Sequence, residues 1–197
     1  MNKYNVRTIT MLATVIFLSS FMLFSWSPLR SSFYSPVYAA AAIQCESNVA
    51  CNGTAGDDNM KGDEGENSIN GEGGNDHISG GGADDVALDG GDGSDTINGG
   101  DGNDEINGGD GNDKLSGGAG NDVVDGNQGN DIVSGEKGDD RLFGQEGNDK
   151  LSGGDGDDLF TGGPGADTFK CGAGGDDEIT DFNEGQGDTK SNDCEIF

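Results

Sequence analysis

The residues of this 197-residue chain best suited to chemistry are aspartates that recur every nine positions. Each stands sixth in a nonapeptide of pattern GGxGxDxUx, where U is apolar. Thirteen such nonapeptides fill residues 53–170, with one extra residue that the spacing places at Asp89 and with Asn67 replacing the aspartate in one copy. Carboxylates are hard oxygen ligands, so this series predicts cation binding. The twelve candidate metal ligands are Asp58, Asp76, Asp85, Asp95, Asp104, Asp113, Asp122, Asp131, Asp140, Asp149, Asp158 and Asp167.

The rest of the nonapeptide predicts the elements that position these aspartates. Glycine reaches positive φ without steric cost, so the glycine-rich first six residues predict a turn. The last three residues predict a short strand whose middle side chain points inward, because side chains alternate across a strand. One such unit cannot bury its apolar residue alone, so successive units must stack. The expected inward residues are Met60, Ile69, Ile78, Ala87, Ile97, Ile106, Leu115, Val124, Val133, Leu142, Leu151, Phe160 and Phe169.

Stacking places carboxylates above one another. Two nonapeptides complete one coil of a flattened parallel β-solenoid, so aspartates eighteen residues apart are neighbours. At a strand spacing of about 4.8 Å, bare carboxylates such as those of Asp95 and Asp113 would repel strongly. Calcium fits between them, because it takes about six to eight oxygens and accepts mixtures of carboxylate and carbonyl. The spacing predicts seven sites from Asp95 to Asp167, two weaker sites before the extra residue and two across it, hence seven to eleven calcium ions.

The nonapeptides of residues 53–170 resemble the calcium-binding repeats of the RTX (repeats-in-toxin, hemolysin-type) family. The resemblance implies an all-β fold, a right-handed parallel β-roll, in which the aspartates at the sixth position bind calcium together with turn carbonyls. It does not imply a toxin. The segment Ile179 to Phe182 and the glycine-rich turn at 185–188 are similar to the segments that close RTX arrays.

Composition sets the condition under which this fold can form. The chain has 38 acidic and ten basic residues, a formal net charge of −28. High net charge with few apolar side chains is typical of intrinsic disorder. The repeat overrides that interpretation only if cations neutralise the carboxylates, so the sequence predicts an expanded metal-free state and a calcium-folded state. The acidic charge also excludes nucleic acid as a partner.

The first 42 residues form a separate segment. Lys3 and Arg7 precede an apolar run at 9–26, and small residues follow at 39–42. This arrangement is typical of a secretory signal peptide that is cleaved near 39–42. An uncleaved membrane anchor is the alternative, because eighteen mostly apolar residues just reach the length that spans a bilayer. We therefore expect a secreted or cell-surface protein in a calcium-rich, oxidising space.

Four cysteines flank the repeats, Cys45 and Cys51 before them and Cys171 and Cys194 after them. Disulfides persist in oxidising compartments, and of three possible connectivities the local pairs, 45 with 51 and 171 with 194, are favoured. Such bridges suit caps that protect the end coils of a solenoid. The expected organisation is a signal peptide or anchor at 1–42, an amino-terminal cap at 43–52, the repeats at 53–170 and a carboxyl-terminal cap at 171–197.

An enzymatic function is not expected. Only the 10 residues at 43–52 and the 27 at 171–197 lie outside the repeats and the first segment. A catalytic domain usually needs about 100 residues of its own. His77, the single histidine, stands at an outward strand position and is expected to be a solvated side chain.

Three functional hypotheses remain. The leading one is a secreted calcium-binding protein that serves as a structural or adhesive module at the cell surface or in the extracellular matrix. The second is an accessory protein that binds another exported protein through a sheet face or edge strand. The third, a cytolytic hemolysin-like factor, would need a membrane-active segment in the mature chain, and none is visible. Contact with a membrane is expected only if the first segment stays uncleaved.

Overall fold

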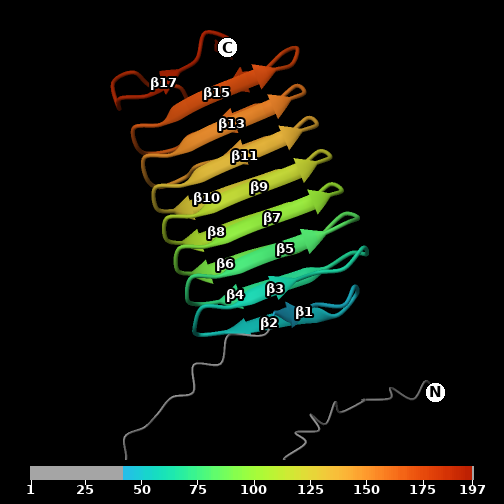
Figure 1. Ribbon diagram of the computed structural model, residues 1–197. Helices are drawn as coiled ribbons and strands as arrows, with labels where there is room; N and C mark the ends of the chain where they lie inside the picture. Colours follow the sequence, from blue (N-terminus) through green and yellow to red (C-terminus); the bar gives the residue numbers. More distant parts are fainter. Residues whose placement is uncertain (1–41, 197) are drawn as a thin grey trace, which may run out of the picture. The chain divides into compact units, whose positions relative to one another are not determined.

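The computed structural model describes residues 42–196, which form eighteen strands in two nine-stranded sheets (Figure 1). The expectations about the amino-terminal segment at 1–41 lie outside these residues. No helix of the described part is long and apolar enough to cross a bilayer.

The odd-numbered strands form one sheet and the even-numbered strands form the other, and we call them the odd sheet and the even sheet. The odd sheet contains β1 (Ile43–Gln44), β3 (Asn59–Lys61), β5 (His77–Gly81), β7 (Thr96–Asp101), β9 (Lys114–Ala119), β11 (Ile132–Lys137), β13 (Lys150–Asp155), β15 (Thr168–Ala173) and β17 (Thr189–Lys190). The even sheet contains β2 (Ala50–Thr54), β4 (Ser68–Glu72), β6 (Ala87–Asp92), β8 (Glu105–Asp110), β10 (Val123–Gln128), β12 (Arg141–Phe143), β14 (Leu159–Thr161), β16 (Glu178–Ile179) and β18 (Glu195–Ile196).

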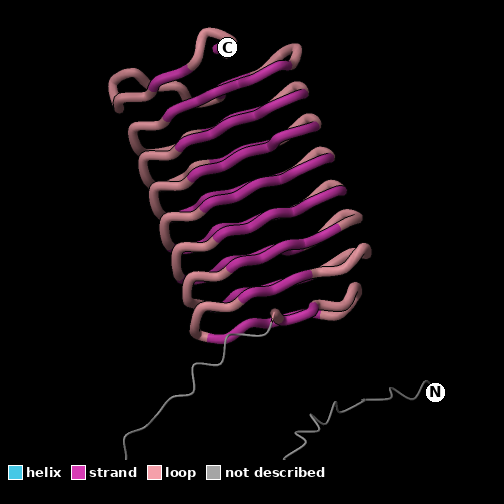
Figure 2. The backbone as a smooth tube through the Cα atoms, in the orientation of Figure 1, coloured by secondary structure: helices cyan, strands magenta, loops and turns pink. Residues whose placement is uncertain are grey.

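The chain changes sheet at every strand, so each strand pairs in parallel with the strand two elements later. β9 and β11, for example, align Leu115 with Val133, which lies eighteen residues further along the chain. Figure 2 shows the resulting coils stacked one on another, with a turn at each edge. This topology confirms the predicted parallel β-solenoid with two nonapeptides in each coil.

The core lies between the two sheets, and each strand of the repeats contributes one inward side chain to it. Each inward side chain of the repeats is at most 1% exposed. The layer is aliphatic along most of its length and aromatic near its carboxyl end, where Phe160 packs edge-on against Phe169 with ring centroids 6.2 Å apart. Burial of one apolar residue per nonapeptide therefore joins all the coils into a single core.

The extra residue lies earlier in the chain than the spacing indicated. Leu88 rather than Ala87 occupies the inward position, aligned with Ile106 in β8. Val86 and Ala87 are exposed, and Asp89 takes the ninth position of its nonapeptide. Leucine removes more apolar area from water than alanine, so the turn before β6 takes up the additional residue. Both sheets continue through this point, and the array is not divided into two blocks.

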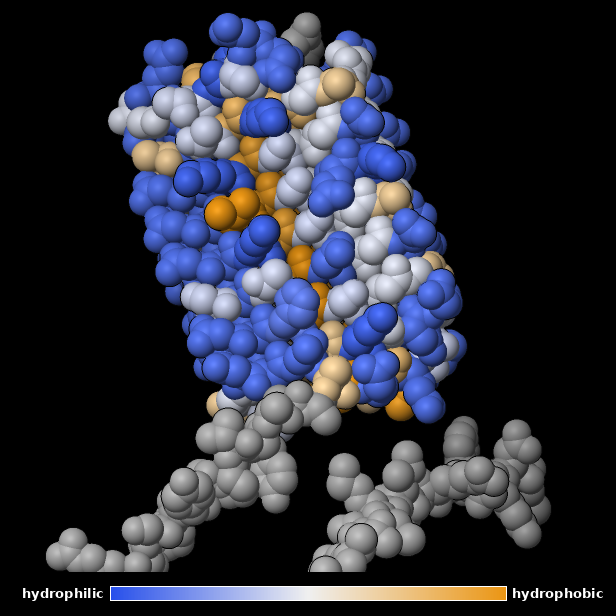
Figure 3. Space-filling model, viewed as in Figure 1, coloured by the Kyte–Doolittle hydropathy of each residue, from blue (hydrophilic) through white to orange (hydrophobic). Residues whose placement is uncertain are grey.

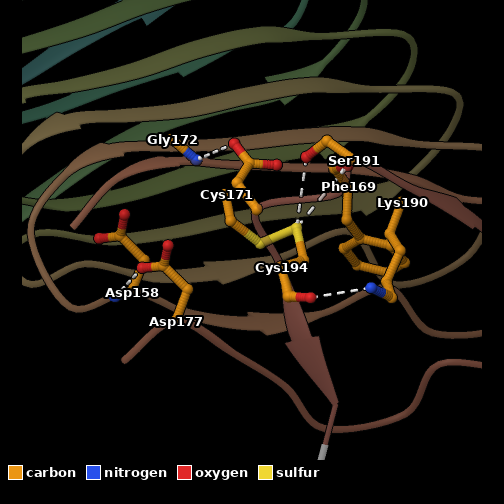
Figure 4. The surroundings of a disulfide bond; sticks show 9 residues. Asp158, Phe169, Cys171, Gly172, Asp177, Lys190, Ser191 and Cys194 are labelled. Atoms are coloured by element: carbon orange, nitrogen blue, oxygen red, sulfur yellow. Dashed lines mark hydrogen bonds between the residues drawn. A yellow bond between two sulfur atoms is a disulfide. The ribbon is translucent and has the colours of Figure 1, made fainter. Parts of the chain in front are cut away.

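Both ends of the roll carry a disulfide. Cys45 is bonded to Cys51, and Cys171 is bonded to Cys194 (Figure 4), which confirms the predicted local pairing. Cys171 and Cys194 are buried, so the second bond extends the core into the carboxyl-terminal segment.

The core column of the odd sheet ends at a basic residue. β17 pairs with β15 so that Lys190 aligns with Phe169, in the register of the inward residues. The Lys190 ammonium donates a hydrogen bond to the carbonyl oxygen of Cys194 at 2.8 Å (Figure 4). The last coil therefore places a charge where every earlier coil of this sheet places an apolar side chain.

Candidate metal centre

Each repeat aspartate is bonded to the coil before it. Oδ1 accepts a hydrogen bond from the backbone N–H of the aspartate one coil earlier, as Asp131 Oδ1 does from Asp113 at 2.8 Å. The same bond recurs at 2.7–3.0 Å along both edges of the roll, with Asn67 in place of one aspartate. The candidate ligands thus form two ladders, one at each edge.

The ladders are continuous across the extra residue. Asp76 donates its backbone N–H to Asp95 Oδ1 at 2.7 Å, and Asp85 donates to Asp104 Oδ1 at 2.8 Å. Both pairs are nineteen residues apart instead of eighteen. The two sites that the spacing left open therefore have the same geometry as the others.

The second carboxylate oxygen has a different environment. Oδ2 is buried in eleven of these aspartates and has no hydrogen-bond partner. Buried polar atoms are nearly always paired, and leaving one unpaired costs about 1–3 kcal/mol, more when it is charged. A regular series of such atoms indicates a ligand other than a protein donor. The eleven are Asp76, Asp85, Asp95, Asp104, Asp113, Asp122, Asp131, Asp140, Asp149, Asp158 and Asp167.

The first glycine of each nonapeptide keeps the space beside this oxygen open. A Cβ atom on Gly108 would lie 2.5 Å from Asp113 Oδ2 and 2.7 Å from the carbonyl oxygen of Gly126. A Cβ atom on Gly126 would lie 2.5 Å from Asp131 Oδ2 and 2.9 Å from the carbonyl oxygen of Gly144. A carboxylate oxygen and a carbonyl oxygen of the following coil thus face one small volume, which any side chain would fill.

Burial raises the pKa of the ladder carboxyls above the ordinary value. The pKa is raised to about 7 for Asp131 and Asp140 and to about 6 for Asp85, Asp113, Asp122, Asp149 and Asp158. Desolvation is the main cause, and neighbouring charges add to it, those of Asp113 and Asp149 in the case of Asp131. The charged form therefore lacks a positive partner among the protein groups, and a bound cation would supply one.

The sequence profile of the RTX calcium-binding nonapeptide repeat (4 copies) matches residues 52–87, 89–124, 108–142, 134–169 and 143–179, well over half of the chain. The chain belongs to this RTX repeat family. Comparison with curated proteins finds no match.

RTX repeats bind calcium, and the donors in this roll fit that ion. Within residues 42–196, no three His, Cys, Asp or Glu side chains gather around one point. The ladder instead combines carboxylates with backbone carbonyls, as Asp113 does with Gly126. Calcium accepts such oxygen mixtures, whereas zinc prefers nitrogen and sulfur ligands. Asp113 and its counterparts would hold the ion, and the ion would neutralise their charge and link successive coils.

The first positions of the RTX ladders are satisfied by protein groups. Asp58 Oδ2 accepts hydrogen bonds from the backbone N–H and the hydroxyl of Thr54, at 2.7 and 2.9 Å. The Asn67 amide nitrogen donates to the carbonyl oxygen of Gly65. Of the twelve aspartates that the sequence singled out, Asp58 alone therefore lacks a buried oxygen without a hydrogen-bond partner.

Two further aspartates, missed by the sequence analysis, extend the RTX ladders into the carboxyl-terminal segment. Asp177 Oδ1 accepts a hydrogen bond from Asp158 N–H at 2.9 Å, and Asp188 Oδ1 accepts one from Asp167 N–H at 3.0 Å. Their coils are longer than eighteen residues, which hides the period. The sequence signal was the spacing of Asp177 and the inward Ile179, which is the spacing found in the repeats.

Proposed function

We propose that this protein is secreted, folds when its repeats bind calcium, and serves as a structural or adhesive module at the cell surface or in the extracellular matrix. The main support is the series of eleven buried carboxylate oxygens without a protein donor. We assign up to one calcium ion to each of these oxygens, in line with the seven to eleven ions expected from the sequence.

Charge makes folding and binding a single process. Without the first 42 residues, which hold three basic and no acidic residues, the chain keeps seven basic and 38 acidic residues, a net charge of −31. Eleven calcium ions would reduce this charge to about −9, and each ion would link two coils. Coils that support one another should then form together, so folding should depend steeply on calcium concentration.

Calorimetric titration of the protein with calcium, followed by circular dichroism, tests this proposal. We expect uptake of several ions per chain and a gain of β-sheet signal that a chelator reverses. Magnesium is the matched control, because it demands tighter octahedral geometry and retains its waters, and it should not restore the signal at equal concentration. A β-sheet spectrum that is unchanged by the chelator, with no stoichiometric uptake, would refute the proposal.

The proposed location is tested by fractionating the producing cells. The two disulfides agree with an oxidising compartment. We expect the protein in the medium or on the cell envelope, with a mass that corresponds to cleavage near residues 39–42. A structural or adhesive role further requires that the chelator release the envelope-bound fraction. A reduced, full-length protein confined to the cytosol would contradict secretion.

A further inference from the structure

The outward side chains of the roll separate by charge once the strands are assigned to sheets. The seventh and ninth residues of each nonapeptide point outward, and together they form a mixed series along the sequence. Because alternate nonapeptides enter different sheets, one half of this series lies on the odd sheet and the other half on the even sheet. The two outer faces therefore need not carry the same charge, and they do not.

The outer face of the odd sheet is basic. Among the described residues, no Asp or Glu occupies a seventh or ninth position in strands β3 to β15. Exposed lysines stand there at Lys61, Lys114, Lys150 and Lys170, among serine, threonine and asparagine side chains. Glu136 in β11 is an acidic side chain on the same face, and it accepts a hydrogen bond from the Ser116 hydroxyl at 2.6 Å. Figure 3 shows this side of the roll, where an orange, hydrophobic stripe runs along the stack of coils between pale and blue, more hydrophilic side chains. We call these outward side chains the basic face.

The outer face of the even sheet is acidic and more apolar. Its outward positions carry Asp89, Glu105, Asp125 and Glu178. Val123, Phe143 and Leu159 lie among them. Arg141 is the one basic side chain at these positions within the described residues. We call the outward side chains of β4 to β16 the acidic face.

The centres of the two faces are complementary. On the basic face, Ile132 is 47% exposed and aligns with Lys114 on one side and Lys150 on the other. On the acidic face, Val123 is 37% exposed and aligns with Glu105 on one side and with Arg141 on the other. Both columns have the same spacing of about 4.8 Å, because they belong to the same coils. An apolar residue beside charges of opposite sign can therefore be matched in register across two flat surfaces.

We propose that the calcium-loaded roll associates with a second copy of this chain, the basic face of one copy lying on the acidic face of the other. Like-charged faces repel, so contacts between two basic or two acidic faces are disfavoured. A contact between unlike surfaces does not close by two-fold symmetry, and the pair keeps one free face of each kind. Association is thus open-ended, and lateral stacks form.

The size of the faces sets the strength of the contact. Seven strands at about 4.8 Å and six residues at about 3.3 Å give a face of at most about 670 Å², because β12, β14 and β16 are shorter. Stable specific interfaces bury about 800 Å² on each partner, so this contact lies at the weak end of the range. Association is therefore expected in the micromolar to submillimolar range and should weaken as salt screens the charges.

Bound calcium is a condition for this association, so the inference rests on the proposed function. Each metal-free chain carries a large negative charge that drives copies apart, and both faces require the folded sheets. Circular dichroism of each sample shows whether the protein has folded with calcium, separately from whether it associates. A sample that folds with calcium but stays monomeric contradicts only the association.

Sedimentation velocity of the calcium-loaded protein, with matched variants, tests the contact. Lys114→Glu with Ile132→Glu alters the basic face, and Glu105→Lys with Val123→Lys alters the acidic face. All four residues hold the seventh position of consecutive nonapeptides, so their local environments are equivalent. Glu184→Lys, an exposed charge change on neither face, is the control.

Wild type and the control should show sedimentation coefficients that rise with protein concentration and fall with added salt. Each double variant should sediment as a monomer. An equimolar mixture of the two double variants should associate again, because each supplies the intact face that the other lacks. A monomeric wild type at all concentrations, or a mixture that stays monomeric while wild type associates, overturns the proposal.

Discussion

The ladder aspartates in the middle of the roll and those at its two ends differ in the hydrogen bonds that their second carboxylate oxygen accepts. In the middle, Asp113 and Asp131 keep a buried oxygen to which no protein group donates a hydrogen bond. At the ends, Thr54 donates to Asp58, and the backbone N–H of Asn183 donates to Asp188 at 2.8 Å. A disulfide also lies at each end and nowhere between. The ends are held by hydrogen bonds and covalent bonds, whereas the middle keeps carboxylate oxygens that a cation could neutralise.

The pKa directions follow the same division. Burial raises the pKa of the central carboxyls, to about 7 for Asp131. Near the ends, the backbone N–H of Gly65 lowers the pKa of Asp63, and the Ser191 side chain lowers that of Asp193. Under the proposed function, the roll therefore combines a charged centre that needs calcium to fold with ends that do not.

The largest expected effect is a loss of protection in the middle when calcium is removed. Hydrogen exchange measured by mass spectrometry should accelerate by orders of magnitude over residues 95–167 after chelation. Exchange around the disulfide between Cys171 and Cys194 should change less, because its hydrogen bonds do not involve the cation. Equal acceleration along the whole chain would show that centre and ends do not differ.

The next largest effect is that acid substitutes in part for calcium. A carboxyl whose pKa is higher in the folded chain stabilises the fold when protonated, and this stabilisation is lost as pH rises through that pKa. With central values of about 6 to 7, the metal-free protein should gain β-sheet signal as pH falls from about 8 to 6. The calcium-loaded protein should instead bind calcium more weakly, because protons compete for the same oxygens. Circular dichroism at each pH measures the β-sheet signal of the metal-free protein, and calcium titration measures the affinity. If both rose or both fell as the pH was lowered, protons and calcium would not act on the same carboxylates.

Gly108→Ala should weaken calcium binding in the middle of the roll, because its methyl group would fill the space beside Asp113 Oδ2. Overpacking of this kind costs about 1–3 kcal/mol, and the calcium midpoint should rise accordingly. Gly73→Ala is the matched control, since its Cβ atom would meet nothing closer than 3.6 Å. Thermal unfolding in saturating calcium compares the two variants. Equal melting temperatures would show that the glycine does not protect the site.

The smallest expected effect is a difference in calcium midpoint between a substitution at a central aspartate and one at an end position. Asp131→Asn keeps an oxygen for the hydrogen bond from Asp113 but removes the charge, so we expect about a tenfold weaker calcium midpoint, or about 1.4 kcal/mol. Asp58→Asn should have less effect, because Thr54 already satisfies that carboxylate. Calcium titration followed by circular dichroism distinguishes them, and a larger effect at Asp58 would reverse the comparison.

The repeat was enough to predict the strands, the core and the ladders, because one nonapeptide fixes both its turn and its inward side chain. Period alone could not place the extra residue, since Ala87 and Leu88 are both apolar. The choice depends on how much apolar area each would bury between the sheets. The local disulfides were predicted correctly because the caps bring together cysteines that are near in sequence.

The carboxyl-terminal ladder positions escaped prediction for another reason. Asp177 and Asp188 reach their ladders through coils with extra residues, which stacking tolerates but a fixed period does not. The opposite charges of the two faces appear only when the outward residues are sorted by side of the coil, which the predicted two nonapeptides per coil allowed. The pairing of β9 with β11, and of β8 with β10, separates Lys114 from Glu105.

Lys190 limits how this protein could lengthen during evolution. A nonapeptide appended after β17 would have to enclose an ammonium group in its apolar layer, which is costly without a charged partner. Duplication upstream, between Cys51 and Cys171, would only insert more identical coils. New length should therefore arise inside the array, and the carboxyl-terminal coil should remain last however many repeats the gene acquires.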